Sequence, residues 1–182
     1  HFLDLVRNSV RAGATRIRIA ILAEVPADLL TLTVDDNGSG MPPEHLETVL
    51  DPFSTTRTTR SVGLGLPLLQ ESAVRTGGRV SIRSAVREGT SVVTTFGLSS
   101  IDRPPLGDLG DTLSLLLVSD PEIEYEMEIA SGGAAYRFHT GAARRDIPGI
   151  PLSDPAVSAW IRDHVNEAVG LILGGILDEV TR

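Results

Sequence analysis

The sequence predicts an α+β protein: a two-layer α/β sandwich in which helices cover one face of a mixed sheet, followed by a small C-terminal α+β unit. Apolar residues recur at helical spacing in residues 2–10 and again after Gly65, whereas residues 17–21, 30–34 and 80–96 alternate between apolar and polar side chains, as strands do. With 182 residues, 41% of them hydrophobic, the chain can build one substantial core.

The first predicted elements are a helix, two strands and a short helix. The helix spans residues 2–10 and ends before Gly13. The strands at 17–21 and 30–34 follow, with a turn between them that contains proline. A proline and a glutamate then favour the first turn of a short helix over residues 43–50.

The next segment is predicted to be a mobile loop, because residues 51–62 are rich in Ser, Thr and Arg and show no apolar period. A helix begins near Gly65 and ends at Gly77. A hairpin with its turn at residues 87–89 completes a first domain of residues 1–101.

The pattern breaks at residues 102–105, where two prolines predict a linker. Beyond it we predict a small α+β domain of residues 106–182. Its expected elements are a helix at 109–118, strands at 123–129 and 134–140, and a helix that begins near Ser153.

Composition excludes several classes of site. The net charge of −8 argues against a nucleic-acid surface, which needs basic residues to neutralise phosphates. The absence of cysteine excludes disulfides, thiolate nucleophiles and cysteine-bound zinc, and the absence of lysine excludes phosphate loops that depend on it.

No apolar run of membrane-spanning length and no signal peptide is visible, so we expect a cytoplasmic protein. Because helical spacing is already present at Phe2, we expect that its natural N-terminus has been removed.

Asp4 and Asn8 lie four residues apart and therefore share one face of the first helix. The amide oxygen of Asn8 is suited to Mg²⁺, and Asp4 to orienting or deprotonating a water beside a phosphate. The alternative is an ordinary solvated polar face.

Asp36 ends a strand and is followed by a glycine-containing turn at residues 37–40. Its carboxylate can accept a hydrogen bond from the exocyclic amine of adenine; the alternative is a tight turn with a local capping role. Gly63 and Gly65 open a helix whose exposed N–H groups can bind phosphate, with Arg57 and Arg60 nearby. The alternative there is a plain glycine-rich loop.

Five segments occur in one order, at residues 4–9, 36–40, 52–56, 63–66 and 89–90. Together they resemble the N, G1, F, G2 and G3 motifs of the GHKL superfamily, which comprises DNA gyrase, heat-shock chaperone ATPases, sensor histidine kinases and mismatch-repair ATPases. The resemblance covers about residues 1–98 and is highly specific. It implies the Bergerat ATP-binding fold, with ATP and Mg²⁺ as cofactors.

The resemblance also implies roles for individual residues. Asn8 is the expected Mg²⁺ ligand, Asp36 binds adenine, and residues 51–62 are the lid over ATP. Asp4 is the predicted catalytic residue, although hydrolysing members usually carry the longer glutamate there. The predicted nucleotide-binding residues are Asn8, Asp36, Gly38, Gly40, Met41, Phe53, Thr55, Thr56, Arg57, Arg60, Gly63, Leu64, Gly65, Leu66 and Thr90.

The branch of the superfamily is indicated by the predicted lid. Residues 8–17 look like the mismatch-repair ATPases, whereas residues 51–57 and 63–68 look like the histidine kinases, and the lid favours the kinases. Three functions stay open: an ATP-dependent phosphotransferase or ATPase, a nucleotide-sensing switch without turnover, and an anti-sigma-type serine kinase. None of the four histidines stands in the pattern of a phosphoacceptor helix. We expect ATP or ADP as ligand and a protein partner bound through the C-terminal unit or the missing N-terminus, with no nucleic acid and no membrane span.

Overall fold

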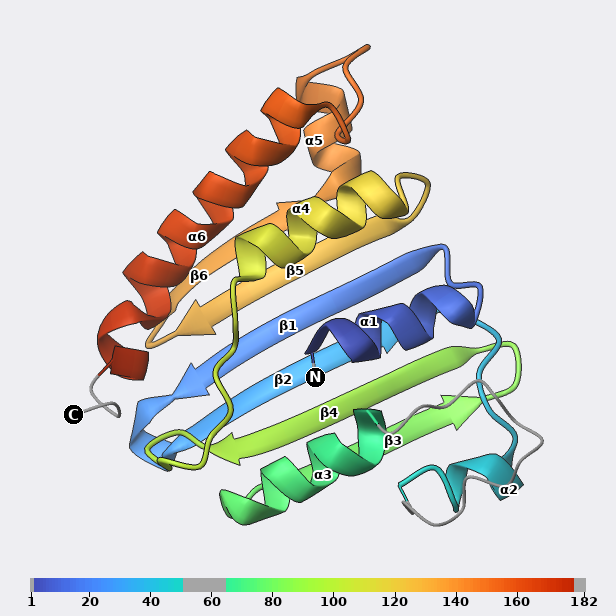
Figure 1. Ribbon diagram of the computed structural model, residues 1–182, viewed down its shortest axis with the longest axis vertical. Coiled ribbons are helices and arrows are strands. Elements are labelled where there is room, and N and C mark those ends of the chain that lie inside the picture. Colours follow the sequence, from blue (N-terminus) through green and yellow to red (C-terminus); the bar gives the residue numbers. More distant parts are fainter. Residues whose placement is uncertain (1, 51–64, 179–182) are drawn as a thin grey trace.

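The protein forms one six-stranded sheet with a layer of helices on one side (Figure 1). The computed structural model describes residues 2–50 and 65–178. Its elements in chain order are α1 (Phe2–Arg11), β1 (Arg16–Glu24), the 3₁₀ helix η1 (Val25–Ala27), β2 (Leu29–Asp36), α2 (Pro43–Leu46), α3 (Gly65–Arg75), β3 (Arg79–Ala85), β4 (Gly89–Gly97), α4 (Leu109–Ser119), β5 (Glu124–Ser131), β6 (Ala134–His139), α5 (Thr140–Asp146) and α6 (Pro155–Asp178).

The sheet has the strand order β3-β4-β2-β1-β5-β6 and is mixed. β1 runs antiparallel to β2 on one side and parallel to β5 on the other, so that Ile17 lies opposite Asp36 in β2 and Tyr125 in β5. The other strand pairs are antiparallel. The predicted α+β fold class with a mixed sheet is therefore confirmed.

Burial alternates along the strands, which explains the single helical layer. In β1 the side chains of Ile17, Ile19 and Ile21 are buried, whereas Arg18 and Leu22 on the opposite face are exposed. Figure 1 shows α1, α3, α4 and α6 lying over the same face of the sheet. Side chains of alternate residues point to opposite faces of a strand, so only one row per strand can enter this core.

The C-terminal residues belong to the same sheet as the first hundred. The segment between β4 and α4 contains no helix or strand, in agreement with the expected linker, but β5 pairs with β1 along its whole length. Helices α4 and α6 of the C-terminal segment pack together over β5. Their buried residues include Leu113, Leu117, Ile161 and Val165. The division into two domains stays a prediction; the two parts share one sheet and one continuous core.

Several boundaries differ from those expected. Helix α2 ends at Leu46 rather than near residue 50. Helix α5 was missed, because its seven residues are too few to show a helical period, and its cap is the side chain of His139 rather than a usual capping residue. The cap of α6 is Asp154, whose Oδ1 accepts hydrogen bonds from the N–H groups of Ala156 and Val157, and not Ser153.

Helix α6 is longer than expected and runs for 24 residues. Neither it nor any other helix within residues 2–50 and 65–178 combines the length and the apolar character that crossing a lipid bilayer requires.

Tyr125 on β5 is fully buried, yet its hydroxyl group has no hydrogen-bond partner in the described part of the chain. Burial, and to a smaller extent the charge of Asp120, raises the pKa of this hydroxyl above its usual range, so it stays neutral. An unpaired buried hydroxyl destabilises a fold because it has left its hydrogen bonds with water behind.

We therefore expect Tyr125→Phe to raise the free energy of unfolding by about 1 kcal/mol, because the substitution removes only the unpaired hydroxyl. Urea denaturation followed by circular dichroism measures the change. Tyr136→Phe is the matched control, since that ring is only half-buried, and its effect should stay near zero. A loss of stability in Tyr125→Phe would show that the hydroxyl has a partner after all.

Candidate functional site

A cavity of about 170 Å³ lies between α1, the start of α3 and the sheet. Its floor consists of two cross-strand pairs: Val34 lies opposite Val92, and Asp36 lies opposite Thr90. Residues two apart on a strand point to the same face, so the register of β2 and β4 places an apolar pair and a polar pair side by side.

Both oxygens of the Asp36 carboxylate are held by neighbours. The hydroxyl of Ser9 donates to Oδ2 at 2.6 Å, and the backbone N–H of Gly38 donates to Oδ1 at 2.9 Å. Each carboxylate oxygen can accept a further hydrogen bond. Asp36 thus has a fixed orientation with lone pairs still able to accept a donor from a ligand.

The loop after Asp36 is fixed from both sides. The N–H of Ser39 donates to the carbonyl of Ala12 at 2.8 Å, and the N–H of Arg87 in the β3–β4 turn donates to the carbonyl of Ser39 at 2.7 Å. Gly40 has a φ of +65°, and a Cβ there would overlap the carbonyl oxygen of Ala85. This position needs glycine for both its backbone conformation and its close packing.

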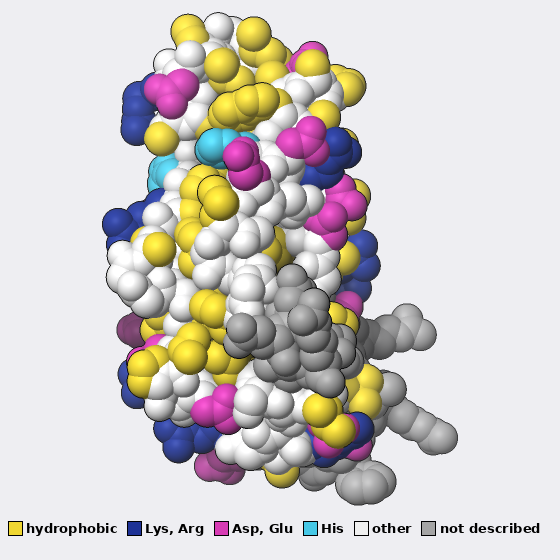
Figure 2. Space-filling model, turned by 90° about the vertical axis from the view of Figure 1, so that its left-hand side faces the viewer, with side chains coloured by type: hydrophobic (Ala, Val, Ile, Leu, Met, Phe, Trp, Pro, Cys, Tyr) yellow, Lys and Arg dark blue, Asp and Glu magenta, His cyan; other side chains and the backbone are white. Residues whose placement is uncertain are grey.

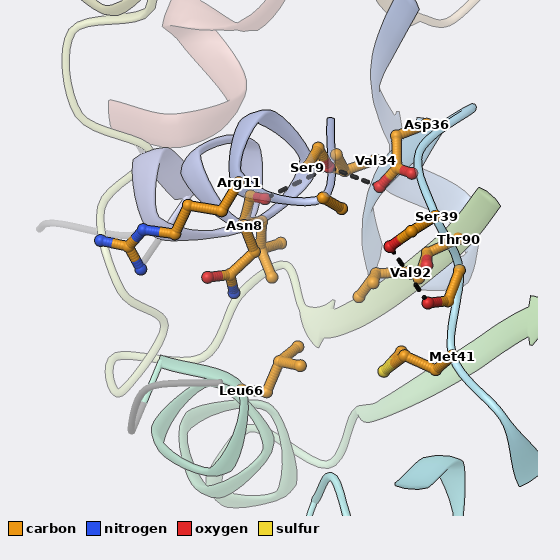
Figure 3. A pocket seen from close by; sticks show the side chains of 13 residues that line it. Asn8, Ser9, Arg11, Val34, Asp36, Ser39, Met41, Leu66, Thr90 and Val92 are labelled. Atoms are coloured by element: carbon orange, nitrogen blue, oxygen red, sulfur yellow. Dashed lines mark hydrogen bonds between the residues drawn. The ribbon is translucent and has the colours of Figure 1, made fainter. Parts of the chain in front are cut away.

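Helix α1 contributes the opposite wall. Figure 3 shows Asn8 pointing toward Leu66 of α3, with Arg11 and Asp36 on opposite sides of Asn8. A neutral amide and a guanidinium from successive turns of one helix therefore stand at one end of the cavity, and a carboxylate at the other.

Asp4 occupies a different position from Asn8. It is exposed on α1, one turn earlier, and does not line the cavity. It lies beside the first residue of α3, since a Cβ on Gly65 would be 3.3 Å from the Cβ of Asp4. Its catalytic role stays a prediction.

The structure brings together many of the predicted nucleotide-binding residues. Gly38 adjoins the cavity through its bond to Asp36, and Gly65 opens α3. The cavity wall contains Asn8, Asp36, Gly40, Met41, Leu66 and Thr90. Seven predicted residues lie outside the described residues: Phe53, Thr55, Thr56, Arg57, Arg60, Gly63 and Leu64.

Several residues of the cavity wall were not predicted from the sequence. Ser9 and Arg11 line the cavity beside Asn8, and Val34 and Val92 form its floor. Arg11 is one helical turn after Asn8, so the spacing used to pair Asp4 with Asn8 would also have found it. The two valines follow from strand alternation only once the β2–β4 register is known.

This arrangement suits a flat ligand that carries a hydrogen-bond donor at one end and negative charge at the other. The apolar floor can contact a ring, the Asp36 carboxylate can accept from an amine, and Arg11 can pair with an anion. No cluster of three or more histidine and carboxylate side chains that could hold a metal is found in the part of the chain that the structure describes. A metal ion would depend on Asn8 and on oxygens of the ligand, which fits the way Mg²⁺ is bound with phosphates.

Comparison with known proteins identifies relatives among bacterial sensor kinases. The chain is 33% identical over 102 residues to the sensor histidine kinase ZraS of Salmonella typhimurium, an alignment that covers 56% of this chain and 21% of the kinase. It is 38% identical over 104 residues to the sensor protein kinase FleS of Pseudomonas aeruginosa, covering 57% of this chain and 25% of that protein. The chain thus spans a quarter or less of the length of these two relatives.

Among solved structures, the Aquifex aeolicus MutL ATPase domain complexed with ADP is 18% identical, with a TM-score of 0.41 over 75% of this chain and 60% of that one. The family described as "Histidine kinase-, DNA gyrase B-, and HSP90-like ATPase" matches residues 2–100. The resemblance to the GHKL superfamily is confirmed, and because the match extends over more than half of the 182 residues, the chain belongs to this family of ATP-binding domains.

Proposed function

We propose that this protein binds ATP with Mg²⁺ in the cavity between α1 and α3, and transfers or hydrolyses its γ-phosphoryl group as a histidine-kinase-like ATPase. The observation that carries the proposal is the difference in charge between the two ends of the cavity. A fixed carboxylate, Asp36, stands at one end, and Asn8 and Arg11 stand at the other, with an apolar floor beside the carboxylate.

Asp36 would select adenine by its charge and its fixed orientation. The exocyclic amine of adenine can donate to a free lone pair of this carboxylate, whereas guanine presents a carbonyl oxygen at the corresponding position and would be repelled. Val34, Val92 and Met41 offer apolar contact to the ring. The cavity of about 170 Å³ is smaller than typical whole-ligand sites of about 300–1,000 Å³, so in this proposal it receives the base and the triphosphate extends past Asn8.

The phosphates would lie between α1 and the start of α3. Arg11 can pair with phosphate oxygens, and the exposed N–H groups at the beginning of the 11-residue helix α3 favour an anion. Asn8 would hold Mg²⁺ through its amide oxygen, and the ion would supply charge neutralisation on the phosphates. The predicted residues outside the described part, Arg57 and Arg60 among them, belong to the same proposal.

Asp36→Asn should weaken ATP binding about 10- to 100-fold, the usual effect of losing a hydrogen bond to a charged acceptor, while the fold is kept because the amide has nearly the same shape. Isothermal titration with ATP and then GTP, each with Mg²⁺, measures affinity and selectivity.

The matched control for this variant is Asp35→Asn. Asp35 is the preceding residue of β2 and points to the opposite face of the sheet, where its Oδ2 lies 3.9 Å from Nη1 of Arg18. Its substitution should therefore leave ATP binding unchanged. Equal binding of ATP and GTP by the unaltered protein, or an Asp36→Asn variant with normal affinity, would contradict adenine recognition by Asp36.

A second candidate is a nucleotide-sensing switch without turnover, whose C-terminal unit binds a protein partner. The aspartate at position 4, one methylene shorter than the glutamate that hydrolysing members usually carry, favours it. The histidines of the C-terminal unit also have structural neighbours: His139 caps α5, and His164 stacks on Trp160.

Single-turnover incubation with γ-labelled ATP distinguishes the two candidates. For the enzyme we expect label in free phosphate or on protein, and Asp4→Asn should abolish this turnover while ATP affinity changes less than about twofold, because Asp4 does not line the base cavity. Unchanged ATP at full occupancy would support the switch. Turnover that survives in Asp4→Asn would reject Asp4 as the catalytic residue without affecting the proposal of ATP binding.

A further inference from the structure

A second, larger cavity of about 550 Å³ lies at the other end of the sheet, between β6, α5 and α6. These elements lie at the top left of Figure 1. Its volume is within the range of about 300–1,000 Å³ that is usual for small-molecule sites. No residue of this cavity belongs to the nucleotide site.

Aromatic rings form much of its wall. The imidazole of His164 stacks on the indole of Trp160, with ring centroids 5.1 Å apart, and meets the ring of Tyr136 edge-on at 5.5 Å. Phe138 and Ile161 add apolar surface. Figure 2 shows hydrophobic side chains and histidines gathered at the upper end of this face of the molecule. Trp160 is 64% exposed, so a ligand in the cavity could cover its ring.

Two of the three basic side chains that line this cavity, Arg137 and His139, are already engaged. Nε and Nη2 of Arg137 both donate to Oε1 of Glu128, at 3.1 and 2.8 Å. Nδ1 of His139 accepts a hydrogen bond from the N–H of Gly141 at 2.9 Å, and its Nε2 lies 3.3 Å from Oε1 of Glu126. The charge of Arg137 is therefore balanced by Glu128 within the protein.

Other polar groups of the wall are still available, and among them the carboxylate of Asp146 is an acceptor. Within the described residues Asp146 has neither a hydrogen bond nor an ion pair, and the hydroxyl of Tyr136 and the ring nitrogens of His164 have no hydrogen bond. Burial raises the pKa of the Tyr136 hydroxyl, which keeps it neutral. Asp146 thus contributes an unpaired carboxylate to a cavity whose wall also contains a tryptophan and a tyrosine ring, and both carboxylates and aromatic rings attract cations.

We propose that this cavity binds a small protonated amine with an aromatic or branched apolar body. The apolar body would fill the space between Phe138, Ile161 and Trp160, and the ammonium group would lie near Asp146 and the aromatic faces. The proposal does not depend on ATP binding, because the two cavities share no residue.

The emission of Trp160, the single tryptophan of the chain, provides a direct readout of occupancy. Three probes of nearly equal size separate the contributions of charge and apolar contact: 2-phenylethylammonium, 2-phenylethanol and phenylacetate. We expect a saturable change of Trp160 emission with the ammonium probe, at least about fivefold weaker binding of the alcohol, and no saturable binding of the carboxylate.

Asp146→Asn should weaken binding of the ammonium probe about fivefold and leave the alcohol unaffected, because only the charge is removed. Glu71→Gln is the matched control, since Glu71 is an exposed carboxylate on α3 and away from this cavity, and it should change neither affinity. Equal binding of the three probes, no saturable binding of the ammonium probe, or an Asp146→Asn variant with unchanged affinity would each overturn the proposal.

Discussion

One-sided burial of the sheet is the constraint on which the rest of the structure depends. Each central strand places one row of side chains in the core and leaves the other row outside, so all packing helices must share one face. Helices α1, α3, α4 and α6 lie over this face of the sheet (Figure 1). One gap lies between α1 and α3 over β2 and β4, and another lies between α5, α6 and the edge strand β6.

The carboxylate of Asp36 links three parts of the first cavity. Its bond from Ser9 reaches α1, its bond from Gly38 closes the following turn, and its strand position places it opposite Thr90 of β4. Its two hydrogen bonds therefore join helix α1 and the following loop to the strand end that carries the carboxylate. Fixing an acceptor before the ligand arrives reduces the entropy lost on binding, and this is how a small polar contact gains selectivity.

Most helices and strands of this fold were predictable from the sequence, whereas the pairing between distant strands was not. Alternation of apolar residues was enough to locate the strands and to place Asp36 at the end of one of them. The pairing of β1 with β5, in which Arg16 lies opposite Glu124, has no local signal, because it joins segments far apart in the chain. The second cavity was missed for a different reason, since α5, the seven-residue helix that forms part of its wall, was not expected.

The parallel pairing of β1 with β5 also determines how the chain can be divided. The family match ends at residue 100, but a protein cut there would uncover the edge of β1 from Arg16 to Ala23, which β5 occupies in the whole chain. It would also uncover the apolar residues Ile17, Ile19 and Ile21 where α4 and α6 help to enclose the core. Unprotected strand edges pair with edges of other molecules. The C-terminal residues thus cover a strand edge that the family-matched segment would leave open by itself.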